Sequence, residues 1–121
     1  MFSYSVYKIL HLSGIFMVLL SVGGVALHVI NGGNKDFEAK KFIGKFHGVG
    51  LLFILVAGFG MLARLHEGAL QGWVITKIFV WLSFAGITAL IYRSGSKAKL
   101  YFVLALFLSV TAAYMALYKP F

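Results

Sequence analysis

The sequence is dominated by four long apolar segments, each about as long as a membrane crossing requires. A hydrocarbon core of about 30 Å takes roughly 20 residues of helix. Lipid offers no hydrogen-bond partner to the backbone, so a span must be a helix or a closed barrel. The segments lack the alternation of apolar and polar residues that marks barrel strands. They therefore predict helices over residues 4–30, 42–63, 73–92 and 100–118.

Composition supports lipid as the solvent of these helices. Of the 121 residues, 61% are hydrophobic and 12% are charged, whereas a soluble domain carries about 25% charged residues. The connections between the segments are short, so consecutive helices are expected to lie side by side and antiparallel. We therefore predict an all-α integral membrane protein, in which residues 1–121 form a single membrane domain built as an antiparallel bundle of four transmembrane helices.

The first segment differs from a cleaved signal peptide, because it is longer than the apolar core of one and no small-x-small cleavage site follows it. We expect it to remain as a helix. Asn31, Gly32 and Gly33 come directly after it. Glycine readily adopts the left-handed conformation that ends many helices, so the first helix is predicted to end here. The chain contains no cysteine, which excludes disulfides and thiolate metal sites.

The net charge of +8 is concentrated at the ends of the apolar segments. Most basic residues flank the first and third connections, at Lys35, Lys40, Lys41, Lys45, Arg93, Lys97 and Lys99, against Lys8, Arg64 and Lys119 on the other side. The positive-inside rule places the richer side in the cytoplasm. Both termini are then expected in the periplasm of a bacterial inner membrane. No nucleic-acid-binding motif accompanies the charge, so the expected partner is the lipid bilayer.

Two ionisable residues lie inside the spans near the outer leaflet. His11 is about seven residues into the first helix and Lys77 about four residues into the third, which gives them similar depth. The Lys77 amine either extends to the headgroups, with Trp73 as an interfacial anchor, or points into the bundle beside His11. No Asp or Glu lies within a span. The anionic partner of Lys77 is therefore Glu67 at the rim, a bound molecule, or none.

The remaining histidines lie near helix ends. His28 and His47 are at comparable depth on the inner side, and His66 lies in the outer connection. Each either bonds a backbone carbonyl or a headgroup, or ligates a b-type haem between helices, for which imidazole is a standard axial ligand. His11 and His28 are about 26 Å apart along one helix and are unable to serve one iron. No helix carries two histidines at a zinc-binding spacing.

Glycines indicate where helices approach each other. Gly44 and Gly48 form a small-xxx-small pair, the pattern of close helix contacts in membranes. The same glycines flank His47 in "GKFHGVG". They therefore predict either close helix packing or a place where a flat cofactor presses against the backbone.

Two stretches carry a resemblance to a known group. "YKILHLSGI" at the start of the first helix and "GWVITK" at the start of the third resemble the small bacterial membrane families of HemJ-type protoporphyrinogen oxidases and SirB-like proteins. The resemblance implies that His11 and Lys77 are the catalytic pair, that Trp73 is their aromatic partner, and that the site binds haem b in an oxidoreductase. The chain is shorter than the oxidases and lacks their proline–arginine signature at the end of the first helix.

Three classes of function follow from these patterns. The first is a redox or tetrapyrrole protein with haem b at His11 and Lys77, or at His28 and His47 if iron is bound on the inner side. The second is a non-enzymatic accessory or assembly subunit, whose glycine faces pack in a homo-oligomer or larger membrane complex. The third is a small dimeric transporter. It is the weakest, because proton-coupled exchangers of this size normally need a carboxylate inside a span.

Overall fold

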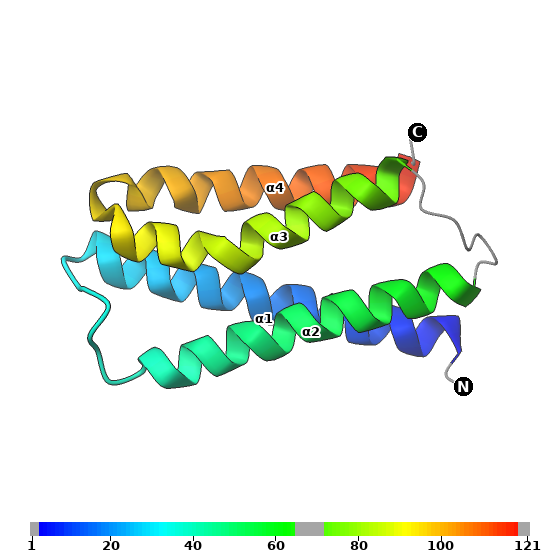
Figure 1. Cartoon of the computed structure of the whole chain (residues 1–121), viewed down its shortest axis with the longest axis horizontal. Coiled ribbons are helices and arrows are strands. Elements are labelled where there is room, and N and C mark those ends of the chain that lie inside the picture. Colours follow the sequence, from blue (N-terminus) through cyan, green and yellow to red (C-terminus); the bar gives the residue numbers. More distant parts are fainter. Residues whose placement is uncertain (1–2, 65–71, 119–121) are drawn as a thin grey trace.

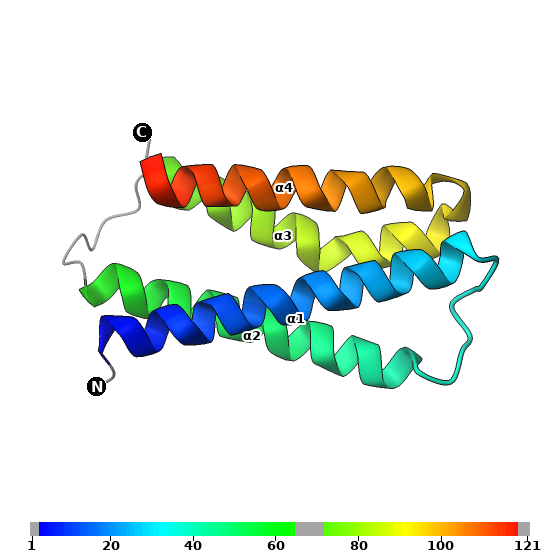
Figure 2. The same cartoon turned by 180° about the vertical axis from the view of Figure 1, so that it is seen from behind.

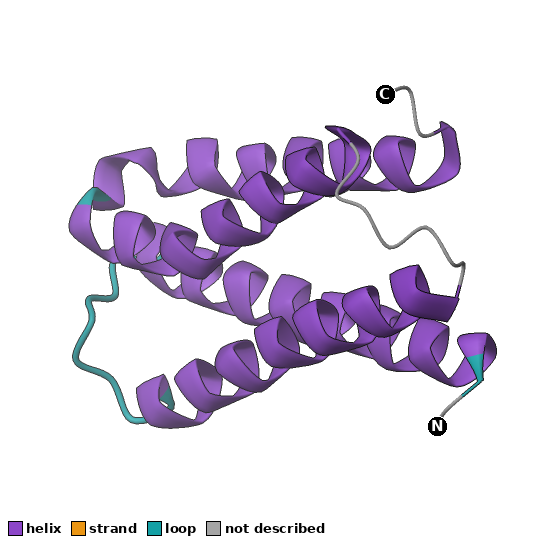
Figure 3. Ribbon diagram, turned by 45° about the vertical axis from the view of Figure 1, so that its right-hand side comes forward, coloured by secondary structure: helices purple, strands orange, loops and turns teal. Residues whose placement is uncertain are grey.

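The computed structural model describes residues 3–64 and 72–118, and these residues are helical apart from short connecting segments (Figure 3). In chain order the elements are α1 (Tyr4–Ile30), α2 (Lys40–Arg64), α3 (Gly72–Arg93), the 3₁₀ turn η1 (Gly95–Lys97) and α4 (Ala98–Tyr118). The predicted all-α class is confirmed. The predicted helix at 4–30 has the observed bounds, and the other three begin or end one or two residues beyond the predicted ranges.

Both ends of α1 follow from local chemistry. The Ser3 hydroxyl accepts a hydrogen bond from the Val6 backbone N–H at 3.3 Å, which caps the first turn. At the other end the N–H groups of Asn31 and Gly32 donate to carbonyls of the last turn. Gly32 has a φ of 90°, a conformation that glycine adopts without the steric cost that a Cβ brings. The predicted helix stop is therefore confirmed.

The helices form two antiparallel hairpins, α1 with α2 and α3 with α4 (Figures 1 and 2). We call the end of the bundle that holds Tyr4 and Tyr118 the outer end, and the end that holds Ile30 and Ala98 the inner end. The start of α1 and the end of α4 lie at the outer end, opposite the basic first and third connections (Figure 1). Consecutive helices pack closely within each of the two hairpins, as predicted. Between the hairpins, α2 and α3 are also consecutive but touch at few points.

Each of the four helices is long and apolar enough to cross a membrane. Large apolar side chains on the perimeter, such as Phe16, Leu52, Phe79 and Leu106, are more than half exposed. A soluble monomer rarely carries so much contiguous apolar surface. Hydroxyls within the spans are satisfied locally: Ser21, Thr76, Ser83, Ser109 and Thr111 each donate to the carbonyl four residues earlier, at 2.7–3.0 Å. These features define an integral membrane protein.

The inner half of the bundle holds a continuous core. Its buried members are small or β-branched residues of α1 with aliphatic and aromatic residues of α3 and alanines of α4, namely Val18, Val22, Val25, Ala26, Val29, Val80, Phe84, Ile87, Ile91, Ala98 and Ala105. Ala26 and Ile91 are completely buried. The two hairpins are therefore joined at the inner end by close van der Waals packing, which drives helix association in lipid.

The closest approach of α1 and α2 is at glycines other than those predicted. A Cβ placed on Gly14 would lie 2.6 Å from the Gly50 carbonyl oxygen, and one on Gly50 would lie 2.9 Å from the Gly14 carbonyl oxygen. A Cβ on Gly44 or Gly48 would meet nothing within 4 Å. The predicted contact at Gly44 and Gly48 is therefore wrong within this chain, because these two glycines lie on the exposed face of α2.

Candidate binding cleft

All four helices contribute to a cleft of about 560 Å³ in the outer half of the bundle. Its walls are regular stripes along each helix; on α3, for example, Val74, Lys77, Ile78 and Trp81 recur at helical spacing. Val18 and Phe84 belong both to the cleft lining and to the inner core, so the cleft ends where the hairpins meet. Its volume is in the range of small-molecule and cofactor sites, about 300–1,000 Å³.

His11 is the central polar group of this cleft. Its side chain is 9% exposed, and Nδ1 lies 2.9 Å from the carbonyl oxygen of Ile54 on α2. A carbonyl oxygen only accepts hydrogen bonds, so the His11 Nδ1 carries the proton and donates it. In the neutral ring Nε2 is then left with a free lone pair. This is the arrangement of most metal-bound histidines, whose second nitrogen donates to a carbonyl or carboxylate.

Glycines on α2 make room for the aromatic side chains of α1. A Cβ on Gly58 would lie 3.3 Å from Cε1 of His11. A Cβ on Gly60 would collide with the ring of Tyr7, one helical turn before His11. The glycine positions of α2 thus set where the His11 ring lies and which carbonyl it can reach.

Two lysines line the same cleft as His11. Lys77 is half-buried. The pairing of His11 with Lys77 stays a prediction, and both residues line this cleft. Lys8 is exposed and lies one helical turn before His11, nearer the outer end. Among the described residues that line the cleft there is no Asp or Glu, so its fixed charges are cationic.

Lys8 and the residues of the opposite walls were not predicted as part of a site. The Trp81 indole N–H donates to the Leu51 carbonyl at 2.9 Å and joins α3 to α2 where the helices are otherwise apart. The wall on α4 consists mainly of small side chains, Ser109, Ala112, Ala113 and Ala116. The sequence did contain one signal for Lys8. It lies three residues before His11, a spacing that places both side chains on the same helix face. The Trp73 side chain and His66 lie outside the described residues.

His28 is engaged with the loop that follows its own helix. Its Nε2–H donates to the Asn34 backbone carbonyl at 2.8 Å, and its ring stacks on Phe37 with centroids 3.9 Å apart. A Cβ on Gly33 would collide with the His28 ring. In this position His28 fastens the first connection to the end of α1.

His47 is 7% exposed and lies in the inner half. Its Nε2 is buried and has no hydrogen-bond partner among the described residues. No hydrogen bond or ring contact joins His47 to His28 in the described part of the chain. Within residues 3–64 and 72–118, no three His, Asp or Glu side chains gather closely enough to hold a metal ion.

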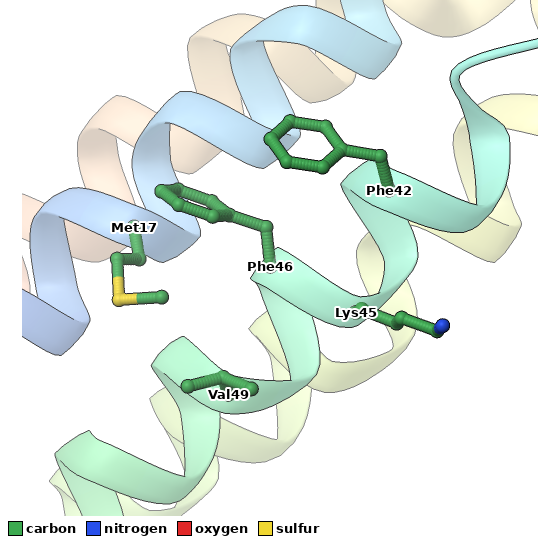
Figure 4. A pocket seen from close by; sticks show the side chains of 5 residues that line it. All are labelled: Met17, Phe42, Lys45, Phe46 and Val49. Carbon is green, nitrogen blue, oxygen red and sulfur yellow. The ribbon is translucent and has the colours of Figure 1, made fainter.

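A second, smaller hollow of about 220 Å³ lies on the outside of the α1–α2 hairpin. The rings of Phe42 and Phe46 lie toward α1 and Met17, with Val49 below them, while the Lys45 side chain extends away from the group (Figure 4). The aromatic rings are 5.8 Å apart. This hollow is lined by apolar side chains and a single charged residue, whereas the outer cleft holds His11, Lys8 and Lys77.

Comparison of the chain with known protein families, curated proteins and solved structures gave no match. The site is therefore characterised by its own geometry alone: an apolar cleft between membrane helices, with one histidine of fixed tautomer and two lysines.

Proposed function

We propose that this membrane protein binds a tetrapyrrole, with haem b as the first candidate, in the outer cleft. The observation that carries the proposal is the position of His11, whose Nδ1–H is held by the Ile54 carbonyl while Nε2 keeps its lone pair. Neutral imidazole in this form is a common axial ligand of haem iron. Bound haem supplies one-electron redox chemistry, and the proposed class of activity is accordingly an oxidoreductase.

The other residues of the cleft fit such a group. The apolar side chains of α1 and α3 suit the faces of a macrocycle, and the small side chains of Ala112, Ala113 and Ala116 leave a flat wall on α4. Lys8 and Lys77 supply positive charge for carboxylates. In this proposal His11 ligates, Lys77 pairs with an acidic group of the ligand, and His28 and His47 lie apart from the site.

The likeness of "YKILHLSGI" and "GWVITK" to the protoporphyrinogen oxidase and SirB-like families supports the same two residues, His11 and Lys77, as the functional pair. We extend the proposal to location. The basic inner end suits the cytoplasmic face of a bacterial inner membrane, and the cleft then lies toward the periplasmic side, with the start of α1 and the end of α4.

The absorbance spectrum of the protein purified in detergent from haem-supplemented cells tests this proposal. We expect a Soret band that shifts on reduction with dithionite. His11→Ala is expected to abolish or shift the band. His28→Ala is the matched control, since His28 is on the same helix but bonded to Asn34, and is expected to leave the spectrum unchanged. A colourless wild-type protein, or a spectrum that depends on His28 instead of His11, overturns the proposal.

A non-enzymatic accessory subunit is the second candidate. It is favoured by Gly44 and Gly48, a small-xxx-small pair at which an added Cβ would meet no described residue within 4 Å. Gly44→Leu with Gly48→Leu is expected to change the oligomeric state or the co-purifying partners if this face is used. An unchanged assembly together with a haem spectrum removes this candidate.

A further inference from the structure

The charged groups of the cleft are not spread evenly along its length. Lys8 lies at the outer end, one turn beyond His11, which is about 4.5 Å along the helix axis. At the opposite end the cleft is closed by Val18, Val80 and Phe84 of the apolar core. The site is therefore polarised from a cationic mouth to an apolar floor.

The sides of the cleft reach the perimeter of the bundle. Leu12, Phe59 and Leu117 line it and are 41%, 43% and 80% exposed. In a bilayer such side chains face acyl chains, so an amphiphile dissolved in the lipid has access to the cleft from the side. An amphiphile in the outer leaflet has its acidic groups at headgroup level and its apolar part below, the same polarity as the cleft.

We propose that Lys8 is the residue that orients the ligand, by binding a carboxylate of the ligand at the outer mouth of the cleft while the apolar body of the ligand extends toward Val18 and Phe84. This rests on the proposed function for the location of the site and deepens it, because it gives Lys8 the role of setting the orientation and the acid selectivity of the ligand. The cleft then selects flat apolar molecules that carry an acidic edge, and it discriminates against the same molecules when the acid is masked.

Lys8 suits this role better than the other basic residues of the chain. Its side chain is exposed at the mouth, so the ammonium keeps contact with the headgroup region when no ligand is bound. A charge-assisted hydrogen bond from an ammonium to a carboxylate is stronger than a neutral one. Lys99 is also exposed but lies at the inner end, on α4, which makes it the matched control.

Binding of metal-free protoporphyrin and of its dimethyl ester to the full chain in phosphatidylcholine nanodiscs tests the inference. Both probes are fluorescent and neither needs an iron ligand. The wild type is expected to bind the diacid about a hundredfold more tightly than the diester, about tenfold for each charge-assisted hydrogen bond, one from Lys8 and one from Lys77. Lys8→Met is expected to lower this preference to about tenfold, the share of Lys77, without changing affinity for the diester. Lys8→Arg, which keeps the charge, and Lys99→Met are expected to retain the full preference.

Equal affinity of the wild type for diacid and diester overturns the inference, and so does a Lys8→Met variant that weakens both probes alike. These results are separable from failure of the proposed function, which is judged on the haem spectrum and His11→Ala. A His11-dependent spectrum without acid preference removes only the role of Lys8. A preference that depends on Lys8 in a protein without a haem spectrum keeps the role of Lys8 and removes the haem. Absence of binding by haem and by protoporphyrin removes both.

Discussion

The inner and outer halves of the bundle are built from the same four helices but differ in how closely the two hairpins pack. In the inner half, small and β-branched side chains bring the two hairpins together, and residues such as Ala26 and Ile91 are completely buried. In the outer half the hairpins separate around a cleft, and His11, Lys8 and Lys77 line the space. Ionisable groups inside a membrane are costly and generally functional. The inner half is therefore the closely packed part of the fold, and the outer half holds the cleft that we propose as the site.

The largest effect is expected from adding volume where α1 and α2 cross. Gly14→Leu places a side chain against the Gly50 carbonyl and the Phe53 Cβ, and such overpacking against backbone is expected to cost about 3 kcal/mol or more. Gly86→Leu is the control, because a Cβ there meets nothing within 4 Å. Unfolding in detergent followed by circular dichroism measures both variants. Equal loss of stability in the two variants contradicts the close contact of α1 with α2.

Removing a large side chain from each half is expected to give the next largest difference in unfolding free energy between the two halves. Ile91→Ala leaves a void in the completely buried inner core, at an expected cost of about 3 kcal/mol. Ile78 lines the cleft and packs against the small buried cluster of Leu62 and Val74, so Ile78→Ala is expected to cost less, about 2 kcal/mol. The same unfolding assay compares them. If Ile78→Ala is as damaging as Ile91→Ala, the outer half is as tightly packed as the inner half.

Adding volume to an alanine in each half gives the converse test. Ala26→Leu overfills the inner core and is expected to destabilise the fold by about 2 kcal/mol. Ala112→Leu adds volume to the cleft wall at the edge of that core, so it is expected to lower the unfolding free energy less than Ala26→Leu does while weakening haem binding. Stability and haem titration are measured on both variants. Undiminished haem binding by a folded Ala112→Leu variant argues against the cleft as the site.

The smallest expected effect concerns the link between α2 and α3. Trp81→Phe removes the indole N–H that donates to the Leu51 carbonyl but keeps an aromatic ring at the cleft. Interhelical hydrogen bonds in membranes average about 0.6 kcal/mol, so the unfolding free energy is expected to fall by roughly that amount. Double-mutant analysis with His11→Phe, whose bond is to the neighbouring carbonyl of Ile54, checks whether the two bonds act independently. A loss of several kcal/mol would show a larger structural role for Trp81.

Much of the fold could be predicted from the sequence because the bilayer dictates it. The length of each apolar segment fixed the four helices, and the glycine at position 32 marked the end of α1. The contacts between helices could not be predicted in the same way. Each span is apolar on all sides, so no stripe distinguishes a buried face from a lipid-facing one. This is why Gly44 and Gly48 were predicted at a contact that Gly14 and Gly50 make.

The candidate site could likewise be predicted only in part. Counting residues into each helix gave His11 and Lys77 the same level, and they line one cleft. Rotation about the helix axis and the partners of each side chain were out of reach, because they depend on the packing of other helices. The same limit applies to His28, which matches His47 in depth but bonds to Asn34 in its own connection.

A high-resolution structure of the full chain loaded with haem in a lipid nanodisc would show directly where the ligand binds. We expect the macrocycle in the outer cleft, in contact with His11, with an acidic group at Lys8 and the inner core unchanged. Haem bound at the inner end beside His28 or His47, or an outer cleft that closes and leaves His11 facing lipid, would contradict it.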